Sequence, residues 1–154
     1  LNTLNLGFGG AFIHSLSNNF ENLFQRLQPK AIVLYLGGND LTLGLSASEI
    51  VEQIRVFVQR IHIKFPSTTI FNVSLKPSFE RQELLEVIQQ INQGMLELSM
   101  QLSYLNQVKF YEFLLDQNQQ IRSDVLLQDG LHLNEQGYQI LKAQIDKALK
   151  NHLL

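Results

Sequence analysis

The sequence predicts an α/β protein, a three-layer α/β/α sandwich whose mainly parallel sheet is covered by helices on both faces. Short runs of branched apolar residues, typical of buried strands, alternate with segments whose apolar residues recur every three or four positions, as in helices. Glycine and polar residues follow the strand-like runs, where α/β sheets gather their ligands. At 154 residues and 45% hydrophobic composition, the chain can form one domain with a sizeable core.

The N-terminal segment predicts a strand, a glycine turn and a helix. Residues 1–6 alternate apolar and polar side chains like a short strand, and residues 7–10, Gly-Phe-Gly-Gly, permit a tight turn after it. The glycines are explained equally well by simple turn chemistry or by a Gly10 N–H that points at a phosphate or a developing oxyanion. Apolar residues then recur at helical spacing up to Pro29, at Phe12, Ile13, Leu16, Phe20, Leu23, Phe24 and Leu27.

A second strand and helix follow. Residues 31–36 form a continuous apolar run, as expected of a strand buried on both faces. The run ends at Gly37-Gly38-Asn39-Asp40, so Asn39 and Asp40 either line a ligand site at the strand end or make an Asx turn. A Ser-x-x-Glu capping box at residues 46–49 then opens a helix that is expected to reach about Lys64.

The C-terminal half continues the alternation. Residues 69–75 predict a strand, residues 80–105 a long amphipathic helix and residues 108–113 a last strand, followed by a loop over residues 116–127. Asn134 can cap a final helix from Glu135 to about Leu149. The expected inward-facing residues of this helix are Tyr138, Leu141, Ile145 and Leu149.

Asp129 and His132 are the candidate acid–base pair. They lie three residues apart on one turn, so the carboxylate can accept the Nδ1 proton of the imidazole and leave Nε2 as a base. The alternative for this spacing alone is that Asp129 caps a local turn and His132 is an ordinary loop histidine.

Composition excludes several function classes. Twelve basic and 14 acidic residues give a net charge of −2, which does not favour nucleic acid or an acidic membrane surface as a partner. The chain has no cysteine and no metal-ligand spacing such as His-Glu-x-x-His, so we expect no disulfide and no metal site. No apolar run approaches the roughly 20 residues that span a bilayer. Compartment and oligomeric state stay open.

Three blocks of this sequence together resemble the SGNH hydrolases, the superfamily that includes the GDSL-type lipases and esterases. They are residues 5–10 (Asn-Leu-Gly-Phe-Gly-Gly), 37–40 (Gly-Gly-Asn-Asp) and 129–132 (Asp-Gly-Leu-His), in the family's order. Lys-Pro-Ser at residues 76–78 is also similar to related acylhydrolases. The resemblance covers essentially the whole chain and implies one SGNH-like domain over residues 1–154 with a flavodoxin-like sheet.

The resemblance also implies an activity and its residues. The chain would be a serine esterase or acylhydrolase acting on a small or medium acyl ester, with no cofactor. His132 would be the base and Asp129 its acid partner. The Gly10 N–H and the Asn39 side-chain amide would form the oxyanion hole.

The family's first block, Gly-Asp-Ser, does not occur in these 154 residues. In the family it supplies the nucleophile and follows a strand inside the sheet, so the resemblance implies that a strand, a turn and a helix are missing, on the order of 30 residues. We therefore expect the natural protein to extend upstream of residue 1 and to carry the serine there.

Two other function classes are open. A catalytically inactive binding module on the same fold would explain the missing serine. A nucleotide- or phosphate-binding domain would use residues 7–10 as a cradle, but the chain lacks a Walker lysine and leaves Asp129 and His132 without a role.

Overall fold

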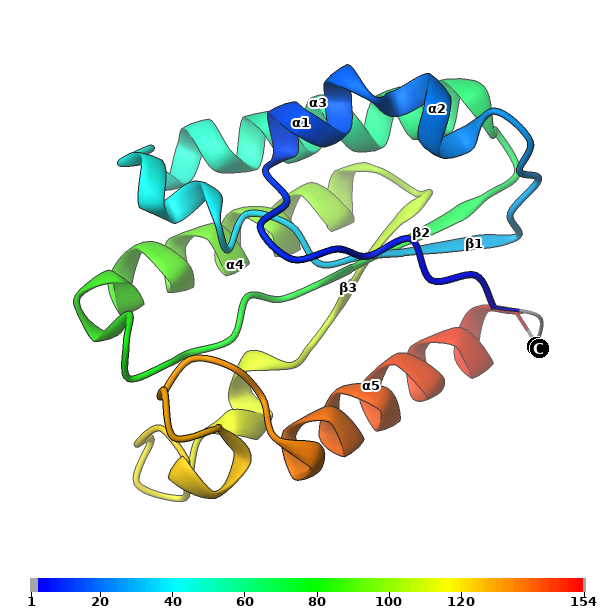
Figure 1. Cartoon of the computed structure of the whole chain (residues 1–154). Coiled ribbons are helices and arrows are strands. Elements are labelled where there is room, and N and C mark those ends of the chain that lie inside the picture. The colour runs from blue at the N-terminus through cyan, green and yellow to red at the C-terminus, as the bar shows by residue number, and fades with distance from the viewer. Residues whose placement is uncertain (1–2, 154) are drawn as a thin grey trace.

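Three parallel strands form one sheet in the order β1-β2-β3 in the computed structural model of the chain, which describes residues 3–153 (Figure 1). The strands are β1 (Ala31–Leu34), β2 (Thr69–Val73) and β3 (Leu105–Val108). In the register, Val33 lies opposite Phe71, and Phe71 opposite Asn106. Because all three strands run in the same direction, the loops after them leave the sheet at one edge.

Helices cover both faces of this sheet, so the predicted α/β/α fold is confirmed. One face carries α3 (Ala47–Lys64) and α4 (Leu85–Gln101), with the short helices α1 (Ile13–Asn18) and α2 (Phe20–Phe24) beyond α3 (Figure 1). The other face carries α5 (Glu135–Leu153). Four 3₁₀ turns lie in the connections: η1 (Asp40–Leu43), η2 (Gln82–Leu84), η3 (Tyr111–Leu114) and η4 (Ser123–Val125).

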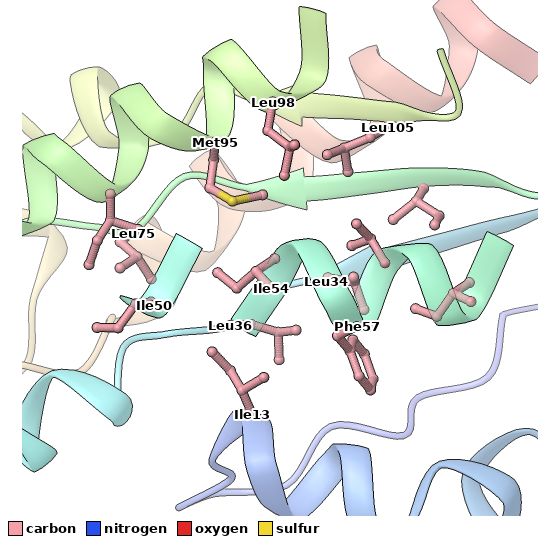
Figure 2. Packing of buried hydrophobic residues seen from close by; sticks show 14 of the residues in the cluster. Ile13, Leu34, Leu36, Ile50, Ile54, Phe57, Leu75, Met95, Leu98 and Leu105 are labelled. Atoms are coloured by element: carbon pink, nitrogen blue, oxygen red, sulfur yellow. The ribbon is translucent and has the colours of Figure 1, made fainter. Parts of the chain in front are cut away.

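The two faces bury separate cores. Side chains from α1, α3, α4 and the strands meet in the larger core, among them Ile13, Ile54 and Met95 (Figure 2). The smaller core lies under α5 and is built around Phe71 and Phe110, both fully buried. Both cores lie between the helices and the sheet. Their packing holds the strands in place, and with them the points at which the loops leave the sheet.

Two predicted helix starts are confirmed by their caps. The Ser46 side chain accepts a hydrogen bond from the Glu49 N–H, and the Glu49 carboxylate accepts one from the Ser46 N–H, as the capping box requires. Asn134 caps α5 by accepting a hydrogen bond from the Gly137 N–H over 3.0 Å. Local side-chain chemistry was therefore sufficient to locate both helix starts.

The expected strand over residues 1–6 is wrong for its described part, because residues 3–6 form no strand; residues 1 and 2 lie outside the described residues. A strand needs a neighbour to pair with, and this segment pairs with none of the described strands. Its apolar side chains Leu4 and Leu6 are exposed as a result.

The last strand was expected over residues 108–113 and lies instead at Leu105–Val108. The Ser74 hydroxyl accepts hydrogen bonds from the Phe110 and Tyr111 N–H groups, 2.9 and 3.0 Å away, and the chain turns there into η3. The preceding helix ends earlier than predicted, at Gln101.

Two smaller expectations also need correction. The helix expected up to residue 27 is broken at Asn19 into α1 and α2. Tyr138, expected to face inward, is 58% exposed, whereas Leu141, Ile145 and Leu149 do pack against the smaller core.

β1 is an edge strand among the described residues, since it pairs there with β2 alone. Val33, which faces the α5 side of the sheet, is 39% exposed, and Tyr35 just beyond the strand is 46% exposed. An apolar edge strand with uncovered side chains is a surface that another strand can pair with. None of the described helices is both long and apolar enough to cross a membrane.

Candidate active site

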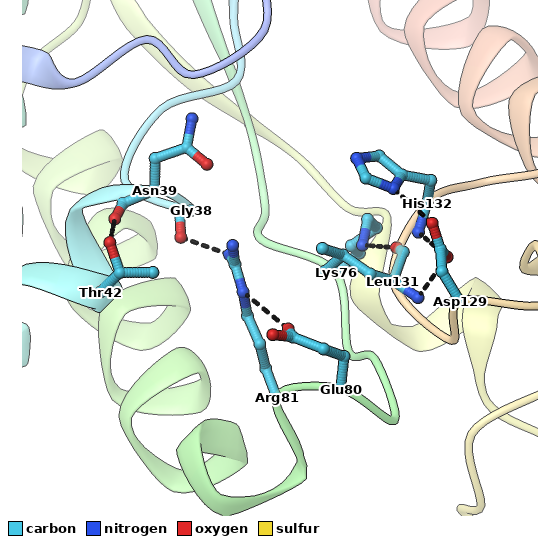
Figure 3. A network of polar contacts seen from close by, with 9 residues as sticks. All are labelled: Gly38, Asn39, Thr42, Lys76, Glu80, Arg81, Asp129, Leu131 and His132. Atoms are coloured by element: carbon cyan, nitrogen blue, oxygen red, sulfur yellow. Dashed lines mark hydrogen bonds and ion pairs between the residues drawn. The ribbon is translucent and has the colours of Figure 1, made fainter.

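The candidate residues lie in the loops at the carboxyl edge of the sheet (Figure 3). Asn39 follows β1, and Lys76 and Arg81 lie in the loop between β2 and α4. Asp129 and His132 lie in the long connection between β3 and α5. The parallel topology therefore brings together residues that are up to about ninety positions apart in sequence.

Asp129 and His132 form the contact that their spacing predicted. The Nδ1 atom of His132 lies 2.7 Å from Oδ2 of Asp129. The other carboxylate oxygen, Oδ1, accepts hydrogen bonds of 2.9 Å from the N–H groups of Leu131 and His132. Asp129 thus caps the turn and orients the imidazole at once, so the two readings of this spacing are compatible.

The charge of Asp129 is strongly stabilised. The hydrogen bond with His132 and those from two backbone N–H groups lower the pKa of Asp129 to about 2, so it is ionised at neutral pH. With Nδ1 held by this carboxylate, Nε2 is the nitrogen of His132 that makes no hydrogen bond to any of residues 3–153. The His132 side chain is 66% exposed, so a substrate can reach it.

Gly130 makes this turn possible. Its φ of +65° lies in the left-handed region, and a Cβ on it would come within 3.1 Å of Cβ of Phe79. Any other residue here would strain the turn and push it away from the loop that follows β2.

Asn39 and Gly10 form a second group. The Asn39 amide donates a hydrogen bond of 3.0 Å to the carbonyl oxygen of Ala11, the residue after Gly10. Gly10 adopts φ +74°, and none of the residues 3–153 accepts a hydrogen bond from its N–H. The hydrogen bond from Asn39 to Ala11 therefore holds Asn39 close to the backbone next to Gly10. The roles of both residues as oxyanion donors stay a prediction.

Asp40 also links the loop after β1 to the segment that leads into α1. It is fully buried, and its Oδ1 accepts a hydrogen bond of 3.1 Å from the Ile13 N–H at the start of α1. Asn39 and Asp40 therefore do not form the Asx turn that was considered for them. Their side chains instead hydrogen-bond to the backbone of residues 11–13.

Lys76 and Arg81 were not predicted as site residues. Lys76 Nζ donates a hydrogen bond to the carbonyl oxygen of Leu131, and Arg81 donates one to that of Gly38 (Figure 3). Burial, with the charge of Arg81 adding to it, lowers the pKa of Lys76 to about 8, while Asp129 and Glu80 act in the opposite direction. The Lys-Pro-Ser sequence was the only signal for either residue.

Two components of a hydrolytic site are not found in the part of the chain that the structure describes. No serine there makes a hydrogen bond to His132. No group of three or more histidine, aspartate or glutamate side chains could hold a metal ion there. The site as described contains an acid–base pair and candidate oxyanion donors.

Comparison with known proteins gives one family. The model of the GDSL-like lipase/acylhydrolase family matches residues 1–140. A comparison with curated proteins gives no match.

Solved structures share the fold. A structure from Streptococcus pneumonia named for platelet activating factor is 27% identical, with a TM-score of 0.82 over 95% of this chain and 72% of its own. A family 3 carbohydrate esterase from Clostridium thermocellum is 26% identical, with a TM-score of 0.72 over 92% of this chain and 66% of its own. A GDSL-like lipase from Bacteroides thetaiotaomicron shows the same fold at 19% identity, with a TM-score of 0.76 over 94% of this chain and 73% of its own.

Proposed function

We propose that this chain, which belongs to the GDSL-like lipase/acylhydrolase family, carries the acid–base and oxyanion-binding part of a serine esterase. Family membership supports a hydrolase of the esterase or acylhydrolase type. The proposal goes further and assigns the reaction to acyl transfer from a small or medium acyl ester to water, through a covalent acyl-enzyme. The observation that carries it is the 2.7 Å contact between Asp129 and His132 at the carboxyl edge of the sheet, which leaves Nε2 without a hydrogen-bond partner among the described residues.

His132 would act first as base and then as acid. A serine Oγ attacks the ester carbonyl carbon while its proton passes to Nε2, and the same proton then goes to the departing alcohol as the C–O bond breaks. Water repeats the sequence on the acyl-enzyme, giving the carboxylic acid and the free serine. Asp129 stays ionised throughout, holds the Nδ1–H tautomer and offsets the charge of the imidazolium.

The negative charge that develops on the carbonyl oxygen needs hydrogen-bond donors. The Gly10 N–H is free among the described residues, and the Asn39 amide uses one of its two N–H groups on Ala11. These two donors, together with the N–H of the serine, would form the oxyanion hole.

We place the serine in a segment upstream of residue 1 that would add a strand beside β1. The exposed Val33 and Tyr35 at the unpaired edge of β1 support this, because a further strand would cover them. The chain also spans 72% of the Streptococcus structure and 66% of the Clostridium esterase. Residues 1–154 and that segment would then form a single domain.

The substrate is proposed only as a class. The Clostridium relative is named a carbohydrate esterase, which supports an acyl group on a hydroxyl of a small molecule. Among the described residues, the connections that follow β1 and β2 are short, which favours small acyl groups over long lipid chains. The proposed chemistry requires no cofactor.

Labelling with a fluorophosphonate, which reacts with activated serines, tests this function. In the full-length protein we expect one adduct, mapped upstream of residue 1, together with hydrolysis of a short-chain nitrophenyl ester. His132→Asn should suppress both, whereas His14→Asn, an exposed histidine with no hydrogen bond to the site, should suppress neither.

A catalytically inactive binding module is the second candidate, and the absence of a described serine partner for His132 favours it. A full-length protein that neither takes up the label nor hydrolyses the ester would select this candidate and reject the esterase.

A further inference from the structure

We propose that Lys76 and Arg81 are positioning residues that hold the two groups of the site, the Asp129–His132 turn and the Asn39 loop, at a fixed separation. Both residues lie in the segment 76–81 after β2, which we call the brace. The inference rests on the proposed esterase function, because it concerns the alignment of a base with an oxyanion hole.

The brace holds the Asp129–His132 turn by three contacts. Lys76 Nζ donates to the Leu131 carbonyl oxygen, and the N–H of Glu80 donates to the Gly130 carbonyl oxygen over 3.3 Å. The close approach of Phe79 to Gly130 adds the third. The bond from Lys76 is charge-assisted and partly desolvated, which makes it stronger than a bond between neutral groups.

The same brace holds the loop of Asn39. Arg81 donates from a guanidinium nitrogen to the carbonyl oxygen of Gly38, the residue before Asn39, and its side chain is only 16% exposed. Its Nε lies 3.3 Å from the Glu80 carboxylate, which helps to fix the direction of the guanidinium. Figure 3 shows Asn39 and His132 on opposite sides of the brace.

The brace itself is fixed to the fold. The Leu75 N–H donates to the side chain of Asn92 on α4 over 2.7 Å, and the Asn92 amide donates back to the Leu75 carbonyl oxygen over 2.9 Å. Ser78 is fully buried within the brace. The cations of the brace therefore extend from a rigid base, which a positioning role requires.

The contacts distinguish positioning from direct catalysis. Neither cation hydrogen-bonds to the His132 ring or the Asn39 amide: each bonds to the backbone of a neighbouring residue. Because a shift of about 1 Å between reacting groups can cost on the order of 100-fold in rate, a backbone tie of this kind affects turnover without touching substrate.

Three variants of the full-length protein test the proposal. Lys76→Met removes the ammonium and keeps the length of the side chain, Lys76→Arg keeps a cation, and Lys109→Met is the control, an exposed lysine after β3 without a described hydrogen bond. We would measure kcat and KM for a short-chain ester and, without substrate, the exchange rate of the Glu80 amide by NMR. That amide reports whether Gly130 stays on the brace.

We expect Lys76→Met to lower kcat by about tenfold or more at a nearly constant KM, and to speed exchange of the Glu80 amide by about tenfold. Lys76→Arg should keep most of the wild-type kcat and most of the protection of the Glu80 amide. Lys109→Met should match the wild type in both measurements. Unchanged exchange in Lys76→Met, or faster exchange with unchanged kcat, would overturn the proposal. If the wild type hydrolyses no ester, the esterase fails, while the exchange rates still decide whether Lys76 holds the turn.

Discussion

Replacing Asn39 by alanine tests the oxyanion hole most directly. The Asn39 amide carries two N–H groups, of which one donates to the Ala11 carbonyl oxygen at 3.0 Å and the other is available to a substrate oxyanion. Removing an oxyanion donor costs about 2.7–4 kcal/mol of transition-state stabilisation, so turnover should fall by roughly a hundred- to a thousandfold. Loss of the bond to Ala11 should lower the free energy of unfolding by only about 1 kcal/mol.

The assay is kcat for a short-chain nitrophenyl ester in the full-length protein, with thermal unfolding measured in parallel. Thr42→Val is the matched control, because the Thr42 hydroxyl donates to the Asn39 carbonyl oxygen over 2.7 Å and its loss perturbs the same loop without removing the amide. We expect the control to change kcat by less than about threefold. Equal turnover in Asn39→Ala and the wild type would remove Asn39 from the oxyanion hole.

Two further predictions concern the C-terminal part of the site. The pKa of Asp129 is about 2 in the folded protein, below its ordinary value, so its contribution to stability is present above about pH 4 and is lost as the pH falls toward 2. Asp129→Asn should therefore flatten this part of a curve of unfolding free energy against pH. A curve identical to that of the wild type would contradict the assignment. Gly137→Ala should lower the free energy of unfolding by about 1–3 kcal/mol in a denaturant titration. The new Cβ would clash with the Val125 carbonyl oxygen and would come within 2.9 Å of the Leu133 side chain. An unchanged unfolding midpoint would contradict this and would mean that α5 can shift to make room.

The fold was predictable where the signal is local. The apolar run from residue 31 and the capping box at residues 46–49 depend on neighbouring residues alone, and both elements begin where they were expected. The strand was expected to reach residue 36 and to be buried on both faces, but it ends at Leu34 and its Val33 is exposed, because β1 pairs with β2 alone among the described strands. The first expected strand does not form over its described residues and the last lies elsewhere, because a strand depends on a distant partner. Residues 3–6 have no described strand beside them, and β3 ends where the Ser74 hydroxyl binds two N–H groups 36 and 37 residues further along the chain.

The candidate site divides in the same way. Asp129 and His132 are three residues apart, so spacing alone could predict their contact. The tie from Lys76 to Leu131 spans 55 residues and that from Arg81 to Gly38 spans 43, and no pattern in the sequence connects such positions. A lysine and an arginine near a turn read as ordinary surface residues until the topology places them.

Strand order explains why these cations lie where they do. β2 is the central strand of β1-β2-β3, so the loop that leaves its carboxyl end runs between the loops that follow β1 and β3. A long side chain on that loop can reach the loop on either side. Arg81 hydrogen-bonds to the loop after β1, and Lys76 hydrogen-bonds to the loop after β3. Their alignment therefore depends on the sheet register as well as on the loops. A change that shifts β2 against its neighbours would move both ties together and would alter the distance between Asn39 and His132 without any substitution in the site.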